Sequence, residues 1–143
     1  MDNIKKKYVR ISDYLKGNNI LFFPADFPKE KIFEQLIGTL EVPDAGLALK
    51  AILDREQWGS TVIAPGLALP HARIPGIARI VAALGICPSQ IFLLFLGSPH
   101  NMQEHLAFLA GVSSLFQTKG FLDQIVSLKT SESVLARIRR LEG

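Results

Sequence analysis

The chain has 143 residues, with 16 basic and 13 acidic side chains, which give a formal net charge of +3. A hydrophobic content of 48% and a mean hydropathy of +0.25 exclude a disordered chain and favour one domain, residues 1–143, with segments buried on both faces. The small charge excess, with no basic patch interleaved with aromatic residues, argues against a nucleic-acid partner. A single cysteine, Cys87, excludes an intrachain disulfide and fits a reducing, cytoplasmic setting.

Lys5-Lys6-Lys7 predicts a solvated terminus. Residues 20–23 predict a short strand that Pro24 stops, and Phe27-Pro28 opens a helix that ends near Gly38. Pro43-Asp44 starts a second helix, which runs toward Trp58-Gly59, where Gly59 suits a C-terminal cap.

Two short apolar runs follow, residues 61–64 and 67–69. Pro65-Gly66 separates them and matches a type II turn, whose second central residue needs a positive φ. We therefore expect a hairpin, with His71 at the end of its second arm, where the chain leaves the sheet. Strand ends of this kind often carry function in α/β domains.

Residues 80–97 contain no charge over 18 positions, which touches the lower limit for a membrane helix. Pro88-Ser89-Gln90 cuts the span into two pieces of strand length, so two buried strands, 78–87 and 91–96, explain it better than membrane insertion. Three helices are predicted next, over 101–117, over 119–128 and after Thr130-Ser131. Strands in the middle with helices on both sides indicate a layered α/β domain.

The segment Pro70-His71-Ala72-Arg73 carries the strongest chemical signal. An imidazole is neutral and nucleophilic near pH 7, and a guanidinium is a natural clamp for a phosphoryl group. A loop histidine beside an unrelated arginine is the alternative, and the spacing alone leaves the two equally open.

The other two histidines carry weaker signals. His105 shares a predicted helix face with Leu109, Val112 and Phe116, so it is either a satisfied, partly buried histidine or one that lies near a second polar group at the sheet edge. His100 is expected in a loop. The spacing of the three histidines does not support a metal site.

The order and spacing of several short segments resemble the type-2 enzyme IIA domains of the bacterial phosphotransferase system, the fructose/mannitol and nitrogen-regulatory group. The resemblance covers nearly the whole chain. The segments that carry it are Ile11-Ser12-Asp13-Tyr14-Leu15, Asn19-Ile20-Leu21, Lys29-Glu30-Lys31, Arg55-Glu56, Gly59-Ser60-Thr61, Gly66-Leu67-Ala68-Leu69-Pro70-His71 and Glu104-His105-Leu106.

The resemblance implies a single-domain three-layer α/β/α sandwich around a small mixed sheet. It implies that His71 accepts a phosphoryl group at Nε2 from the phosphocarrier protein HPr or its nitrogen-branch relative, with Arg55 and His105 completing the active site. Ser60 and Thr61 match a supporting hydroxyl pair, and Arg73 is an additional cation. Such transfer needs positioning and charge neutralisation and no metal or nucleotide cofactor.

Two departures from the family pattern bear on the partners. Val62-Ile63-Ala64 stand where relatives usually place glycines, and Pro88-Ser89-Gln90 is shorter than the usual hairpin segment, which predicts a remodelled partner-facing edge. Three functions stay open: a phosphorylatable nitrogen-regulatory protein, a relay from HPr to a IIB domain in sugar uptake, and a IIA-like binding module that has lost transfer. The sugar, the regulatory target and the oligomeric state are not predicted.

Overall fold

The computed structural model describes residues 9–59 and 61–143, so the predicted charged terminus Lys5-Lys6-Lys7 and Ser60 lie outside the described residues. Two 3₁₀ helices, η1 (Ile11–Tyr14) and η2 (Gly17–Asn19), precede strand β1 (Ile20–Phe22). The remaining elements are α1 (Lys29–Ile37), α2 (Ala45–Glu56), β2 (Val62–Ala64), β3 (Leu67–Ala68), β4 (His71–Arg73), β5 (Val81–Ile86), β6 (Ile91–Gly97), α3 (Met102–Phe116), α4 (Phe121–Val126) and α5 (Ser131–Glu142).

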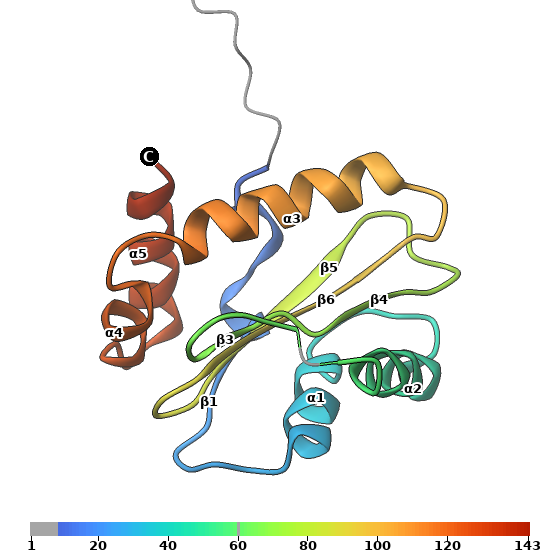
Figure 1. Cartoon of the computed structure of the whole chain (residues 1–143), viewed down its shortest axis with the longest axis horizontal. Coiled ribbons are helices and arrows are strands. Elements are labelled where there is room, and N and C mark those ends of the chain that lie inside the picture. Colours follow the sequence, from blue (N-terminus) through green and yellow to red (C-terminus); the bar gives the residue numbers. More distant parts are fainter. Residues whose placement is uncertain (1–8, 60) are drawn as a thin grey trace, which may run out of the picture.

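The strands form one mixed sheet in the order β1-β5-β6-β3-β2, and β4 also pairs with β6. The β5–β6 and β2–β3 pairs are antiparallel, whereas β1–β5, β3–β6 and β4–β6 are parallel. Figure 1 shows α1 and α2 below the sheet and α3 above it, with α4 and α5 beside α3. This is the three-layer α/β/α arrangement with a small mixed sheet that the family resemblance implies.

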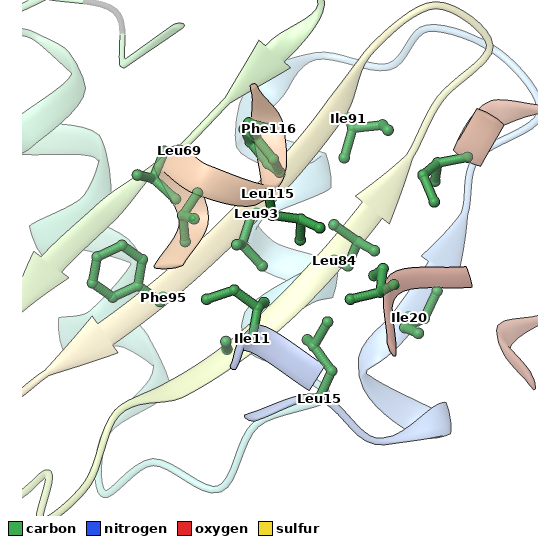
Figure 2. Close-up of a cluster of buried hydrophobic side chains, with 14 of the residues drawn as sticks. Ile11, Leu15, Ile20, Leu69, Leu84, Ile91, Leu93, Phe95, Leu115 and Phe116 are labelled. Atoms are coloured by element: carbon green, nitrogen blue, oxygen red, sulfur yellow. The ribbon is translucent and has the colours of Figure 1, made fainter. Parts of the chain in front are cut away.

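Strand β6 lies at the centre of the fold, because all seven of its residues are buried. Its side chains alternate between the two cores, as a strand buried on both faces requires. Ile91, Leu93 and Phe95 face the core beneath α3, α4 and α5. Phe92, Leu94 and Leu96 face the core beneath α1 and α2. Figure 2 shows part of the first core, including Phe95 and Leu69.

The cap residues explain where the long helices start. The side chains of Asp44, Asn101 and Thr130 accept hydrogen bonds from the first turns of α2, α3 and α5. Gly66 turns the β2–β3 hairpin at φ 76°, as the Pro-Gly pair predicts. A Cβ at that position would also lie 2.6 Å from Leu122 and 3.0 Å from the Ser89 carbonyl oxygen.

Two local predictions are corrected, and the 88–90 turn is located. His71 does not leave the sheet: it opens β4, because the chain returns to β6 with His71 opposite Phe95. Helix α2 ends at Glu56 with Gln57 as its C-cap, and Gly59 follows at φ 142°. The short 88–90 turn precedes Ile91, the first residue of β6, about 13 Å along the strand from Phe95. It therefore lies away from His71.

Candidate functional site

The ring of His71 is held in one tautomer. Its Nδ1 lies 2.7 Å from the carbonyl oxygen of Leu69, two residues earlier. Because a carbonyl can only accept, Nδ1 carries the hydrogen and donates it. The lone pair of the neutral ring is then on Nε2. The backbone that places His71 in β4 thus also selects the nitrogen that can act as a nucleophile.

Phe95 forms the wall behind His71. The two residues are paired across β4 and β6, so their side chains lie on the same face of the sheet. Their rings stack with centroids 4.8 Å apart and an interplanar angle of 3°. His71 is half-buried, and this desolvation is the largest cause that lowers its pKa below the ordinary value. The ring is therefore neutral at pH 7.

Charged side chains from two elements, α2 and β4, lie near His71. Arg55 in the last turn of α2 and Arg73 in β4 both lower the His71 pKa, whereas the Glu56 carboxylate raises it. The effect of Arg55 is larger than that of Arg73. The structure therefore brings together His71, Arg55 and Arg73, and an anion at Nε2 would lie within the field of both guanidinium groups.

His105 lies against the same wall from α3. Its ring centroid is 5.6 Å from that of His71 and 5.6 Å from that of Phe95. The residue is 9% exposed, and within the described residues its buried Nδ1 has no hydrogen-bond partner. Burial, His71 and Arg73 all lower the pKa of His105. His105 is thus close to a second polar group, as one of the two alternatives predicts. The other alternative, a histidine whose buried nitrogens are all hydrogen-bonded, is wrong.

The unpaired nitrogen indicates the tautomer of His105. Nδ1 points toward Gly97, since a Cβ on that glycine would lie 4.0 Å from it. An unpaired buried N–H costs more than an unpaired acceptor, so we infer that the hydrogen is on Nε2. The N–H donor of His105 is then Nε2.

Thr61 does not offer its hydroxyl hydrogen to the site in this state. Its Oγ donates to Oε2 of Glu56 at 3.0 Å, and Oε1 of Glu56 lies 3.9 Å from Nζ of Lys29. The backbone continues the connection, because the amide of Leu69 donates to the carbonyl of Thr61 at 3.0 Å. Glu56 is therefore linked through Thr61 and Leu69 to Nδ1 of His71. Ser60, its predicted companion, is outside the described residues.

Glu104 anchors the start of α3 beside His105. The Tyr14 hydroxyl donates to Oε2 of Glu104, and the Ile80 amide donates to Oε1, both at 3.1 Å. The guanidinium of Arg79 lies 4.1 Å above the Tyr14 ring. These bonds hold the first turn of α3 against the sheet, which fixes where His105 lies.

Several contributors escaped the sequence reasoning. Nothing in the sequence marks Phe95 or the Leu69 carbonyl, because both depend on how β4 aligns with β6. Glu56 could have been predicted to lie near the site, because it directly follows the predicted site residue Arg55. His100 is exposed in a turn and Cys87 is buried, both as predicted.

Two other site types find no support in the described part of the chain. No group of three histidine, cysteine, aspartate or glutamate side chains is placed there to hold a metal ion. None of the described helices is long and apolar enough to cross a membrane, and residues 80–97 form β5 and β6 instead.

Comparison with known sequences gives a consistent family. Residues 14–140 match the model for the phosphoenolpyruvate-dependent sugar phosphotransferase system, EIIA 2. The chain is 25% identical over 142 residues to a nitrogen regulatory protein of Pseudomonas aeruginosa, covering 88% of this chain and 92% of that protein. It is 28% identical over 114 residues to a mannitol-specific phosphotransferase enzyme IIA component of Staphylococcus aureus, covering 73% and 78%.

Solved structures share the fold. The nitrogen regulatory protein IIA-Ntr from Neisseria meningitidis superposes with a TM-score of 0.78 at 21% identity, covering 90% of this chain and 98% of that one. The enzyme IIA of the Escherichia coli complex of IIAMtl with phosphorylated IIBMtl gives a TM-score of 0.72 at 14% identity, covering 88% and 97%.

Proposed function

Because the chain belongs to the EIIA type 2 family of the phosphoenolpyruvate-dependent sugar phosphotransferase system, we propose that His71 is its phosphoryl acceptor. The observation that carries this proposal is the bond from Nδ1 of His71 to the Leu69 carbonyl, which leaves the Nε2 lone pair available. The donor is an HPr-type phosphocarrier protein, and the relay operates in the cytoplasm.

In the transfer step, Nε2 of His71 attacks the phosphorus of the donor's phosphohistidine. A new N–P bond forms, the donor's N–P bond breaks, and its electron pair returns to the donor imidazole. The Nδ1 hydrogen of His71 stays on Nδ1, donated to the Leu69 carbonyl oxygen, so no proton leaves the ring in this step. Catalysis then depends on alignment and on neutralising the phosphoryl oxygens.

Three side chains supply that neutralisation. Arg55 and Arg73 contribute positive charge around His71. His105 donates its Nε2 hydrogen to a phosphoryl oxygen. This role would explain why a histidine is kept in a buried position where its Nδ1 has no hydrogen-bond partner among the described residues. Thr61 joins them only if its hydroxyl turns from Glu56 to the phosphoryl group. None of these steps requires a metal or nucleotide.

Within the family, we propose the nitrogen-regulatory type. The nitrogen regulatory protein of P. aeruginosa aligns with 88% of this chain, against 73% for the mannitol component of S. aureus. The alternative is a relay that passes the phosphoryl group to a IIB cysteine in fructose- or mannitol-class uptake. The solved complex of IIAMtl with phosphorylated IIBMtl supports that alternative.

Mass measurement after incubation with a phosphorylated carrier tests the proposal. Phosphorylated HPr and its nitrogen-branch relative are offered separately, and we expect one acid-labile phosphoryl group that is absent in His71→Ala. Adding fructose- and mannitol-class IIB domains to the loaded protein separates relay from regulation, since only a relay loses the group to them. Failure of both carriers would favour the transfer-inactive binding module.

A further inference from the structure

The large hydrophobic side chains that are exposed to solvent are concentrated near the proposed site. Among the described residues there are eight of these side chains, and five lie within three positions of Arg55, Thr61 or His105 in the sequence. These five are Trp58, Val62, Ile63, Met102 and Leu106. The other three, Phe22, Phe27 and Leu47, lie on β1, before α1 and in α2. Single exposed apolar residues are ordinary, but this concentration is not.

The five side chains form two groups, or sides, and each is adjacent in sequence to a residue that lies near His71, namely Arg55 or His105. On the first side, Trp58 in the α2–β2 connection is 87% exposed, and Val62 and Ile63 on edge strand β2 are about half exposed. Together Val62 and Ile63 give the edge strand β2 an apolar exposed surface.

The second side comes from the start of α3. Met102 and Leu106 are four residues apart and therefore lie on one helix face, with Leu106 58% exposed. His105 lies between them in the sequence. The Arg73 guanidinium contacts Met102, with Nη1 3.8 Å from the sulfur atom. This contact joins the second apolar side to the cations around His71.

The positive charge of Arg55 and Arg73, between the two apolar sides, indicates which kind of protein would bind this surface. Arg55 and Arg73 are exposed, whereas the nearby Glu56 carboxylate is engaged by Thr61 and Lys29. The surface is thus apolar at its sides and positive at its centre. A second copy of this chain would bring four arginines together across a two-fold contact, which is unfavourable. A protein with an apolar face around a phosphoryl dianion is complementary.

We propose that Trp58, Val62, Ile63, Met102 and Leu106 form an apolar docking rim for the phosphorylated donor protein, with Trp58 as its main anchor. The inference rests on the function proposed above. Tryptophan and arginine dominate binding energy where a partner excludes water from them, and here both residue types surround the acceptor. The rim also explains how the chain can bind its donor although the 88–90 hairpin is short and lies away from His71.

Two phosphoryl donors separate docking from chemistry. One is the phosphorylated HPr-type carrier, and the other is phosphoramidate, a small molecule that needs no docking surface. We expect Trp58→Ala to lower kcat/KM with the carrier by about 30-fold, the effect of a binding hot spot, and Leu106→Ala to lower it by about 3–10-fold. Phosphoramidate should load both variants within about twofold of the unmodified protein, since His71 is untouched. Phe22→Ala on the opposite edge strand β1 is the matched control and should leave both rates unchanged.

The outcomes are distinct. Wild-type carrier kinetics in both Trp58→Ala and Leu106→Ala would overturn the docking rim while leaving His71 as the acceptor. Loading of the unmodified protein by phosphoramidate but by neither carrier branch would also overturn it. No loading of the unmodified protein from any donor would overturn the proposed function itself. A dimer in sedimentation analysis that Trp58→Ala dissociates would assign the rim to a second copy and reject the donor.

Discussion

Thr61→Val tests whether the connection from Glu56 to His71 exists in solution. Valine has nearly the shape of threonine but cannot donate to the Glu56 carboxylate, which the Thr61 hydroxyl reaches at 3.0 Å. The Glu56 side chain is only 14% exposed, so water replaces the lost donor poorly. The backbone carbonyl of residue 61, which accepts from the Leu69 amide, is unchanged by the substitution.

The expected cost follows from these contacts. A hydrogen bond to a charged group contributes about 1.5–3 kcal/mol, and the extra methyl group of valine returns part of that in this half-buried position. We therefore expect the free energy of unfolding to fall by about 1.5–2 kcal/mol, with Tm lower by about 3–8 °C for a domain of this size. Phosphoramidate should still load His71 within about threefold, because the Nδ1 bond to Leu69 remains.

Urea denaturation of a double-mutant cycle with Glu56→Ala provides the measurement. If the hydroxyl–carboxylate bond is formed, the two substitutions should couple by at least about 1 kcal/mol. Lys50→Ala serves as the control, because Lys50 pairs with Asp54 on the exposed surface of the same helix and should not couple with Thr61. Additive effects in the Glu56 cycle would refute the reasoning, and Thr61 would then be free to serve the phosphoryl group directly.

Three further predictions concern charge, burial and packing. The Arg55 cation lowers the pKa of His71, so Arg55→Gln should raise that pKa. An NMR titration of the His71 ring should then show protonation, and with it loss of phosphoryl acceptance, beginning at a higher pH. An unchanged or lower pKa would place Arg55 away from the ring. His105→Leu removes a buried nitrogen that has no hydrogen-bond partner among the described residues, so thermal unfolding should show equal or greater stability. Phosphoryl transfer should fall by about 10–100-fold. A large drop in Tm would contradict the unpaired state of the buried nitrogen. In Gly111→Ala the new methyl group would collide with the Val9 carbonyl oxygen. The free energy of unfolding measured in urea should therefore fall by about 1–3 kcal/mol, despite the better helix propensity of alanine. Increased stability would mean that Val9 moves aside freely.

The elements that local chemistry determines were predicted well. Asn101 and Thr130 are cap residues before apolar periodic segments, and α3 and α5 begin directly after them. Pro65-Gly66 likewise predicts the turn that Gly66 makes at positive φ. In each case residues within a few positions of one another determine the structure, so the sequence pattern is sufficient.

The elements that depend on distant pairing were predicted less well. Strand β4 is three residues long, and its pairing with the far end of β6 makes it a strand rather than a loop. The same pairing puts Phe95 behind His71, a contact that no local pattern indicates. The end of α2 was misplaced because Gln57 and Trp58 continue with turn hydrogen bonds before Gly59. The candidate site was therefore foreseeable as a set of residues but not as a geometry.

The position of His71 on β4 also links its reactivity to the folding of the chain. Strands β5 and β6 are neighbours in sequence and form a local hairpin, whereas β4 must close a longer loop to pair with β6 in parallel. Pairings between more distant segments form more slowly in general, so we expect β4 to dock late. Until it docks, the His71 imidazole is a solvated side chain with no fixed tautomer. Pulses of the phosphorylated carrier during refolding would time this event, because the carrier requires the assembled site. The capacity to accept a phosphoryl group from it then identifies chains that have finished folding.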